Sequence, residues 1–285
     1  MTIWTSTREV LFNFPQFYLF DKQNPTMAFP NPFYQIYEGA ALLAGAQAFF
    51  VASRAENNFA VDWDSVPEAV WAKTQLVFVC SPGNPTGAVM PLEEWQKLFA
   101  LSDKYGFVLA SDECYLSFAK DAKSILALSG GQNTGLLAVH SLSKRSNLAG
   151  YRGAFVAGDS KLIARLLEIR KHMGMMVPLP IQKATTVALA DEVHVLEQSE
   201  RYRRRRANLR RALESQGFTI EFSEAGLYLW CTRNEDAWES VAWLANRGIL
   251  ATPGSFYGSQ GARHIRIAMT ATDAQIADAV QRIRA

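Results

Sequence analysis

The stretch from Gln75 to Gly87, QLVFVCSPGNPTG, opens with six residues of which five are apolar and closes with a loop that holds two prolines and two glycines. A short strand that is apolar on both faces is typical of a sheet covered by helices on each side. Proline and glycine end the strand in a tight loop, and Asn84 stands inside it. We therefore expect a buried strand over 75–80 and working residues in the loop that follows it.

Outward from this stretch, short runs rich in β-branched and aromatic residues alternate with longer segments of helical period. The predicted strands cover 26–29, 46–52, 75–80, 107–111, 135–141, 153–157, 227–232, 249–252 and 264–268. The predicted helices cover 7–14, 34–44, 63–72, 92–105, 160–172, 181–189, 193–216, 236–247 and 273–284. This alternation predicts an α/β fold with a mainly parallel sheet.

The chain has 285 residues, which is the length of about two domains. After the long predicted helix over 193–216, the pattern changes to shorter strands and amphipathic helices. We expect a large domain over 1–198 and a smaller C-terminal α+β domain over 199–285.

The net charge is +2, but seven of the 29 basic residues are arginines between Arg201 and Arg211, where no acid occurs. The rest of the chain then has 22 basic and 27 acidic residues, a net charge of −5. A chain-wide nucleic-acid surface is therefore not supported. On a helix, Glu197 and Glu200 precede Arg201 and Arg204 by four, so we expect ion pairs on a solvated helix face.

The other composition signals exclude several classes of protein. The three cysteines are odd in number and have no C-x-x-C spacing, so we expect neither a disulfide framework nor a cysteine zinc site, and a reducing cytoplasm fits best. The four histidines show no metal spacing. The most apolar stretch, 39–52, is too short to span a bilayer, so we expect no membrane partner.

Polar side chains follow four of the predicted strands, where an open α/β sheet carries its working residues. They are Asn84, Asp112 with Tyr115 three residues later, Lys144 between hydroxyls, and Arg152. Each alone has a simple structural explanation as a cap, a turn or a solvated charge. Together they predict one crevice that holds an amide, an acid, a phenol, a lysine and an arginine.

Pyridoxal phosphate needs such a set. Its lysine forms a Schiff base and moves a proton, and a carboxylate keeps the pyridine nitrogen protonated. Its phosphate needs backbone N–H groups at a helix start, hydroxyls and an arginine. The sequence Ser6-Thr7-Arg8-Glu9 predicts a helix that begins with a capping box, in which Glu9 reaches back to the cap.

Four motifs now support a resemblance. They are SPGNPTG at 81–87, SDECY at 111–115, SLSKRSNLAGYR at 141–152 and HIRIA at 264–268. Together they resemble the fold-type I, class I/II pyridoxal-phosphate aminotransferases over residues 6 to 285. The segments PNPFYQIYEGA at 30–40, DKYGFVLASDECY at 103–115 and SLSKRSN at 141–147 most resemble succinyldiaminopimelate transaminases.

The resemblance implies a role for each matching residue around the cofactor ring. Lys144 would be the Schiff-base lysine, and Asp112 the partner of the pyridine nitrogen. Asn84 and Tyr115 would bond the ring's phenolic oxygen, and Tyr34 would stack on the ring.

The resemblance also implies a phosphate site and a substrate site. The phosphate would be held by Thr7, Arg8 through its backbone N–H, Ser141, Ser143 and Arg152. Arg266 would bind the substrate's α-carboxylate with its planar guanidinium, next to Asn84.

The implied reaction is amino transfer between N-succinyldiaminopimelate and 2-oxoglutarate in lysine and diaminopimelate biosynthesis. The open alternatives are another class I/II reaction, such as transamination of aromatic amino acids or carbon–sulfur lysis, and a truncated pyridoxal-phosphate-binding module without catalysis. The family also implies a homodimer that acts on small amino and 2-oxo acids.

Two features depart from the family's pattern. Only five residues precede Ser6, where family members carry a longer segment, so we expect a shortened chain. Ser6 stands where the family usually has glycine, and Pro15 is expected to interrupt a helix that the family usually continues.

Overall fold

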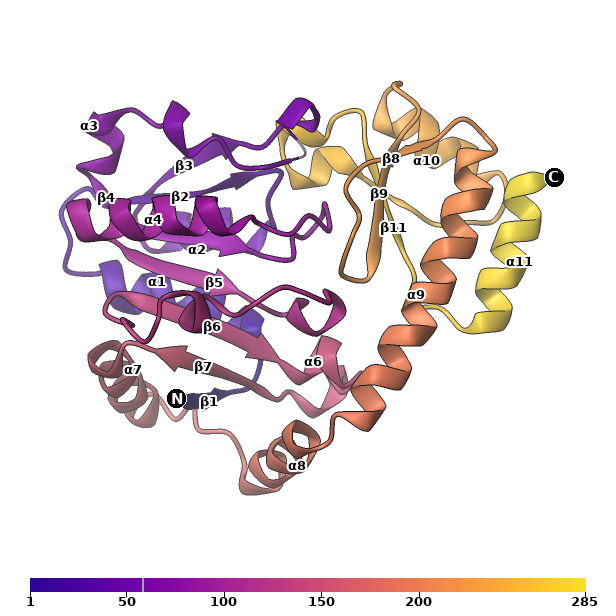
Figure 1. The fold of residues 1–285 in the computed structure, drawn as a ribbon. Helices are drawn as coiled ribbons and strands as arrows, with labels where there is room; N and C mark the ends of the chain where they lie inside the picture. Colours follow the sequence, from indigo (N-terminus) through magenta and orange to yellow (C-terminus); the bar gives the residue numbers. More distant parts are fainter. Residues whose placement is uncertain (58) are drawn as a thin grey trace.

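The computed structural model describes residues 1–57 and 59–285, which form two β-sheets with helices packed around them (Figure 1). The larger sheet has seven strands in the spatial order β1 (Thr2–Trp4), β7 (Ala154–Gly158), β6 (Leu136–Ser141), β5 (Val108–Asp112), β4 (Thr74–Cys80), β2 (Thr26–Asn31) and β3 (Gln47–Ala52). The strands from β6 to β3 run parallel, and β7 and β1 run antiparallel to their neighbours. The predicted α/β fold with a mainly parallel sheet is confirmed.

Helices cover both faces of this sheet, as the apolar strands require. One core contains α1 (Thr7–Leu19), α2 (Ile36–Leu43) and α7 (Ser160–His172). The opposite core contains α3 (Glu68–Trp71), α4 (Leu92–Tyr105) and α5 (Ile125–Leu128). In β4, Leu76 and Phe78 enter the first core, while Val77 and Val79 enter the second. Figure 1 shows α4 in front of the sheet and α1 behind it.

The smaller sheet is antiparallel and has the order β10 (Thr252–Pro253), β11 (Ile265–Ala268), β9 (Tyr228–Thr232) and β8 (Thr219–Ile220). Its core is shared with α9 (Val193–Glu214), α10 (Ala237–Ala245) and α11 (Asp273–Arg284). The helix α8 (Leu179–Ala190) precedes α9, and the long α9 runs beside both sheets (Figure 1). The domain boundary expected between residues 198 and 199 falls inside α9, and it stays a proposal.

The remaining helices are short. A four-residue helix, α6 (Leu142–Arg145), follows β6 directly. The 3-10 turns are η1 (Ala55–Asn57), η2 (Trp63–Ser65), η3 (Leu116–Phe118), η4 (Ala149–Tyr151), η5 (Gly254–Tyr257) and η6 (Ser259–Gly261). No helix in the described part of the chain is both long and apolar enough to cross a membrane.

Helix α1 does not stop before Pro15, so the expected interruption is wrong. The helix continues to Leu19. Proline removes one backbone hydrogen bond, but Phe14, Pro15 and Leu19 lie on the buried face of α1. The apolar area that these residues bury offsets the lost bond.

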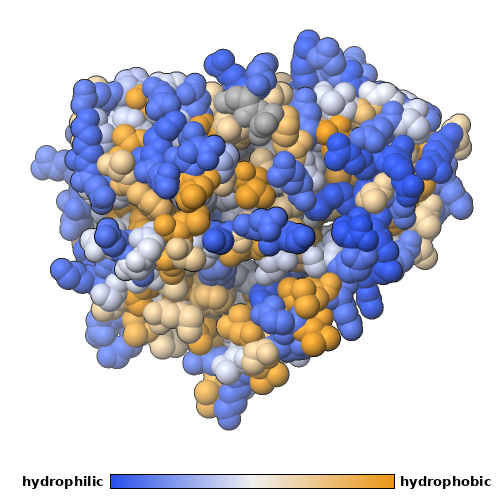
Figure 2. Space-filling view, in the orientation of Figure 1, coloured by the Kyte–Doolittle hydropathy of each residue, from blue (hydrophilic) through white to orange (hydrophobic). Residues whose placement is uncertain are grey.

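The arginines of α9 form different ion pairs from those expected. Glu200 pairs with Arg203, three residues away, at 2.7 Å, and not with Arg204. Among the described residues, no ion pair joins Glu197 to Arg201. Figure 2 shows a hydrophilic surface where α9 and α11 lie, so much of the run does face solvent.

Two of these arginines instead bind the start of α11 and the loop before β9. The side chain of Arg205 is mostly buried, and its Nε lies 2.5 Å from Oδ1 of Asp273. Arg206 donates from Nη1 to the carbonyl oxygen of Glu224 at 2.9 Å and from Nη2 to that of Gly226. The interpretation as a solvated helix face is therefore wrong for Arg205 and Arg206.

Candidate active site

The carboxyl ends of β4, β5 and β6 lie side by side, and they bring the predicted loops together. Cys80 at the end of β4 pairs with Asp112 at the end of β5, and Asp112 pairs with Val139 in β6. Parallel strands place their carboxyl ends at one edge of the sheet. Asn84, Asp112 and Lys144 therefore follow neighbouring strands at the same edge.

Asp112 is a buried carboxylate with a small set of partners. It is 4% exposed, and its Oδ2 accepts from the hydroxyl of Tyr37 at 3.3 Å. Its Oδ1 accepts from the backbone N–H of Cys114 at 3.3 Å. Burial raises the pKa of Asp112, and the Cys114 and Tyr37 hydrogen bonds and the nearby His140 oppose that rise. Among the described residues, no lysine or arginine pairs with this carboxylate.

The start of α1 offers free backbone donors. Ser6 is the N-cap, and its Oγ accepts from the backbone N–H of Glu9 at 3.1 Å, as predicted. Glu9 reaches the backbone N–H of Thr5 at 2.7 Å instead of that of Ser6, so the capping box closes one residue earlier than expected. Within the described chain, the N–H groups of Thr7 and Arg8 have no acceptor.

The helix start lies next to the segment that follows Asp112. The Sγ of Cys114 is 3.3 Å from Oγ1 of Thr7, and Cys114 also bonds Asp112 through its backbone. Thr7 and Asp112 are thus joined through a single residue. The two residues belong to separate sequence motifs, and the motifs alone do not show that Thr7 and Asp112 lie close together.

The turn from β6 into α6 holds the predicted residues Ser141, Ser143 and Lys144, and Arg152 follows just before β7. Ser141 is the N-cap of α6, and its Oγ accepts from the N–H of Ser143 at 3.0 Å. Ser141 pairs with Ala154 in β7, so Arg152 lies two residues from that pair. Arg152 is exposed, has a left-handed φ of 56°, and donates from Nη1 to the carbonyl of Ala149 at 2.7 Å.

Lys144 is half-buried near the end of α6. In the described part of the chain, its amino group has no hydrogen bond and no ion pair, and none joins it to Asp112. It lines a hollow of about 370 Å³ with Ser143, Tyr202 and Leu227. Its amine is thus available to a ligand.

Aromatic side chains stand between the start of α1 and Asp112. The hydroxyl of Tyr34 accepts from Nε of Arg8 at 3.0 Å. Its ring meets that of Tyr37 edge to face, with the centroids 5.9 Å apart. Tyr37 in turn packs on Phe78 and bonds Asp112. Burial raises the pKa of both tyrosines.

Asn84 and Arg266 come from the two different sheets and meet. Nη1 of Arg266 donates to Oδ1 of Asn84 at 2.9 Å. The guanidinium lies over the rings of Tyr228 and Tyr257, 3.9 and 4.9 Å from their centroids. Because β11 lies between β10 and β9, Arg266 is not on an edge strand.

Tyr115 belongs to the same group of side chains. It is 5% exposed, and its hydroxyl lies 3.3 Å from that of Tyr228. Burial, together with the neighbouring Tyr228, raises the pKa of Tyr115 well above its usual value. Tyr228 therefore links Tyr115 to Arg266.

Sequence reasoning missed three tyrosines that belong to this site. Tyr37, Tyr228 and Tyr257 contact Asp112 or Arg266 directly. Tyr37 follows Tyr34 by three residues, which is about one turn of the helix predicted over 34–44, and this spacing is a signal that the sequence did contain. Tyr228 and Tyr257 carried no such signal, because their contacts depend on how the two sheets meet.

The residues present fit pyridoxal phosphate. The buried Asp112 lacks a basic partner among the described residues, and a protonated pyridine nitrogen would supply the missing positive charge. The free N–H groups at the start of α1 and the hydroxyls of Thr7 and Ser141 are donors that phosphate requires. Lys144 adds an amine that has no hydrogen bond or ion pair within the described part of the chain.

The histidines have structural partners. His140 lies 2.9 Å from Glu113, and His264 lies 2.7 Å from Glu221. No group of His, Cys, Asp or Glu in residues 1–57 and 59–285 has the arrangement of a metal site.

The chain is similar to several known aminotransferases. It is 46% identical over 263 residues to a probable aminotransferase of Mycobacterium tuberculosis, covering 91% of this chain and 59% of that protein. It is 45% identical over 262 residues to 4-dedimethylamino-4-oxo-anhydrotetracycline transaminase of Streptomyces rimosus, covering 90% of this chain and 70% of that protein. LL-diaminopimelate aminotransferase 2 of a Nostoc species is 34% identical, with 90% and 67% covered. The chain thus spans about three fifths to seven tenths of the length of these relatives.

Solved structures agree with this similarity. An aminotransferase from Neisseria meningitidis has a TM-score of 0.90 and 37% identity, covering 99% of this chain and 74% of that one. A probable N-succinyldiaminopimelate aminotransferase from Thermus thermophilus has a TM-score of 0.88 and 27% identity, with 99% and 77% covered. The fold is therefore that of the fold-type I aminotransferases. The family model for aminotransferase class I and II matches residues 4–283, and members of that family typically use pyridoxal phosphate, so the chain belongs to the class I and II aminotransferases.

Proposed function

We propose that this chain binds pyridoxal phosphate and transfers amino groups between amino acids and 2-oxo acids. The observation that carries the proposal is the buried carboxylate of Asp112, which lacks a basic partner among the described residues. The free N–H groups of Thr7 and Arg8 lie close to it through Cys114. A flat ligand with a positive charge at one end and a negative charge at the other would satisfy both: its cation would pair with Asp112, and its anion would accept from the N–H groups of Thr7 and Arg8.

Each predicted residue has a proposed task toward the cofactor. Lys144 would hold it covalently, and Asp112 would pair with its ring nitrogen. Tyr34 would pack on the ring, while Asn84 and Tyr115 would bond its phenolic oxygen. When bound, the cofactor supplies an electron sink for a negative charge at the substrate's α-carbon.

The proposed phosphate site uses two elements. Thr7 and the backbone N–H of Arg8 belong to α1, and Ser141, Ser143 and Arg152 belong to the segment around α6. The N-terminal end of the 13-residue α1 would favour the phosphate's negative charge, since the helix dipole leaves partial positive charge there.

The remaining steps belong to side chains of this chain. Arg266 would bind the substrate's α-carboxylate, and Asn84 would hold that guanidinium in place through the 2.9 Å bond. The amine of Lys144 would take the proton from the substrate's α-carbon and later return one. Through its 3.3 Å hydrogen bond, the buried Tyr37 hydroxyl would hold the Asp112 carboxylate in place for the ring nitrogen.

For the substrate, we propose N-succinyldiaminopimelate with 2-oxoglutarate as the amino acceptor, in lysine and diaminopimelate biosynthesis. The support is the similarity to a probable N-succinyldiaminopimelate aminotransferase and to LL-diaminopimelate aminotransferases. The 45% identity to the tetracycline transaminase favours a second candidate, a bulky cyclic oxo compound.

The cofactor proposal is tested by chemistry at Lys144. The purified protein is incubated with pyridoxal phosphate, reduced with borohydride, digested and mapped. We expect the pyridoxyl label on Lys144 and no label in Lys144→Ala. Lys183 serves as the control, because it is an exposed lysine on α8 and lines neither the cavity beside Asn84 nor the hollow beside Lys144. A label at Lys183, or none at saturating cofactor, would contradict the proposal.

The activity is tested with single turnovers. Glutamate should convert the bound cofactor to its amine form, which changes the visible absorption. N-succinyldiaminopimelate should do so faster than aromatic amino acids or the amine of a cyclic polyketide. Cofactor binding without any conversion would support a binding module without catalysis. Release of a thiol or of ammonia from a cysteine conjugate would support carbon–sulfur lysis.

We also propose that the protein acts as a homodimer, because twofold homodimers are the commonest assembly of soluble enzymes. Sedimentation at micromolar concentration, with and without pyridoxal phosphate, tests this. A monomer that converts glutamate would contradict it.

A further inference from the structure

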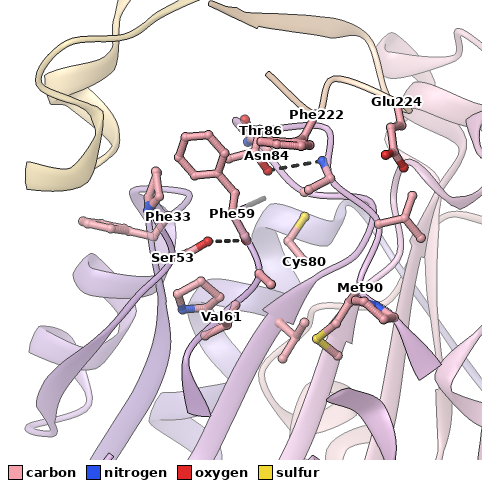
Figure 3. Close-up of a pocket in the computed structure, with 18 of the residues that line it drawn as sticks. Phe33, Ser53, Phe59, Val61, Cys80, Asn84, Thr86, Met90, Phe222 and Glu224 are labelled. Atoms are coloured by element: carbon pink, nitrogen blue, oxygen red, sulfur yellow. Dashed lines mark hydrogen bonds between the residues drawn. The ribbon is translucent and has the colours of Figure 1, made fainter. Parts of the chain in front are cut away.

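A cavity of about 350 Å³ lies beside Asn84, between the ends of β2 and β3, the loop after β4 and residues 222–224 (Figure 3). Its walls are mainly apolar and include Phe33, Phe59, Val61 and Met90. This volume is within the range of small-molecule sites, which are mostly apolar with a few polar groups. Among its described lining residues, only Asn84 and Tyr37 have a role in the reaction proposed above, and the rest of the cavity has none.

The cavity borders the proposed carboxylate site through Asn84. Asn84 lines it, is 8% exposed, and bonds Arg266 through its Oδ1. A carboxylate bound by Arg266 would therefore lie next to Asn84, which is part of the cavity wall. A side chain attached to that substrate could enter the cavity past Asn84.

Glu224 is the only charged side chain among the described residues that line the cavity. In the described part of the chain its carboxylate has no hydrogen bond and no ion pair. Figure 3 shows it above Met90, on a different segment from Asn84. The residue is exposed.

The loop that carries Glu224 is held in place from three sides. Arg206 of α9 donates to the carbonyl of Glu224 at 2.9 Å. The Oγ of the buried Ser223 accepts from the N–H of Trp230 at 2.8 Å and lies 3.3 Å from the carbonyl of Thr86. The N–H of Ala225 donates to the carbonyl of Gly87 at 3.1 Å. The position of Glu224 at the rim is therefore fixed by the fold.

We propose that this cavity is the substrate's side-chain subsite, and that it takes a long apolar side chain whose far end carries an N–H donor, an ammonium or an amide. The apolar walls would bury the methylene groups, and Glu224 would accept from the N–H. Because no cation is among the described lining residues, the distal carboxylate of glutamate would gain no ion pair in this cavity, and glutamate would be held by its α-carboxylate at Arg266. The inference rests on the proposed function, since it places the α-carboxylate at Arg266.

The first test measures binding of heptanoate, a carboxylate with a long apolar chain, to the cofactor-loaded protein by calorimetry. Each buried methylene should improve affinity about four-fold, so heptanoate should bind far more tightly than propionate. Val61→Phe adds a ring to the cavity wall and should lower heptanoate affinity at least ten-fold, with propionate unchanged. Val187→Phe, at an exposed position of α8, is the control.

The second test measures single-turnover rates with lysine, N6-acetyl-lysine, norleucine and alanine. Glu224→Gln should lower the preference for lysine over norleucine three- to five-fold, the range of a partly exposed ion pair. The alanine rate should not change. Glu197→Gln, an exposed position of α9 without a described partner, is the matched control. Glu224 is exposed, so this variant remains informative if Val61→Phe does not fold.

The inference is wrong if Val61→Phe binds heptanoate within two-fold of the parent, or if Glu224→Gln leaves the lysine preference unchanged, while alanine and glutamate are still converted. If Arg266→Lys leaves heptanoate affinity unchanged and no amino acid is converted, the proposed function fails and this inference fails with it.

Discussion

Nη1 of Arg266 donates to Oδ1 of Asn84 over 2.9 Å, and this bond joins β11 of the smaller sheet to the loop after β4 of the larger one. The two residues are 182 positions apart in the chain. The guanidinium is also stacked over Tyr228 and Tyr257. A planar group held by an amide and two rings is oriented before any ligand arrives, which lowers the entropy cost of binding a carboxylate.

Arg266→Lys should weaken every amino-acid substrate together. Lysine keeps the charge, but it cannot form two parallel bonds to a carboxylate or stack on both tyrosines. We expect a loss of about 1.5–3 kcal/mol in substrate binding, or roughly 10- to 150-fold in KM, with cofactor affinity unchanged. Steady-state kinetics with several amino acids and a cofactor titration measure both quantities.

Two results would contradict this role for Arg266. Loss of cofactor affinity in Arg266→Lys would assign the residue to the cofactor site. Unchanged glutamate turnover would place the α-carboxylate site elsewhere.

Gly87→Ala should destabilise the protein. Gly87 has a φ of +74°, and a Cβ there would lie 2.7 Å from the carbonyl oxygen of Ala225 and 3.1 Å from Cα of Ser223. Both are backbone atoms, so neither can move away without a shift of the main chain. We expect the free energy of unfolding to fall by about 1–3 kcal/mol from this clash and the strained φ. Urea denaturation followed by tryptophan fluorescence measures it.

Gly45→Ala is the matched control. Gly45 has a similar φ of +65°, but a Cβ there would meet no atom within 4 Å. Its substitution should cost only about 1 kcal/mol, the price of the left-handed conformation. Equal losses in both variants would show that the contact between Gly87 and Ala225 does not matter.

The strands and most helices could be predicted because their signals are local. Helices α4, α7 and α11 begin and end where helical period predicts. The three-residue β1 and the two-residue β8 were not predicted, because so few residues carry no period. The interruption predicted at Pro15 was wrong, because the low helix propensity of proline does not take into account the buried apolar face that keeps α1 helical.

The candidate site could be predicted as far as strand order allowed. Asn84 follows β4 and Asp112 ends β5, and these two parallel strands pair directly, so the convergence of the two residues follows from the parallel sheet. The contact of Arg266 with Asn84 needed the resemblance to a family. The positions of Tyr228 and Glu224 depend on how the two sheets pack, and no periodicity along the chain encodes that packing.

Arg170→Ala should cost about 3–5 kcal/mol of stability. Its side chain is fully buried, and it donates to the carbonyls of Ile3 and Met175 at 2.6 Å and pairs with Glu9 at 3.1 Å. It also lies over the ring of Trp4, 3.9 Å from the centroid. Removing it leaves a cavity and acceptors without donors.

Arg165→Ala offers the comparison for Arg170. Arg165 is half-exposed and lies 3.9 Å from Asp21, so its loss should cost less than 1 kcal/mol. Chemical denaturation of both variants gives the two values. Because Glu9 belongs to the first turn of α1, Arg170→Ala should also weaken cofactor affinity, whereas Arg165→Ala should not.

Asp112→Asn should stabilise the protein without cofactor while it slows amino transfer. Burial raises the pKa of Asp112 above its ordinary value of 3.8. An acid with a higher pKa in the folded chain binds its proton more tightly when folded, so the free energy of unfolding falls as pH rises from 3.8 through the folded pKa and stays lower above it. Asparagine carries no charge, still accepts from the Cys114 N–H, and escapes this loss.

Thermal unfolding of the cofactor-free parent and Asp112→Asn at pH 7 and near pH 4 tests this pH dependence. The variant should have the higher unfolding midpoint at pH 7, and the gap should narrow toward pH 4, where the parent's carboxyl takes up its proton. With cofactor, the order should reverse, because a carboxylate that pairs with the protonated ring nitrogen gains what the asparagine lacks. The variant should also convert glutamate at least 100-fold more slowly, the effect expected for a lost electrostatic partner in a buried site. A variant that is no more stable at pH 7 without cofactor, yet equally active with it, would show that Asp112 is only a cap for the turn at Cys114.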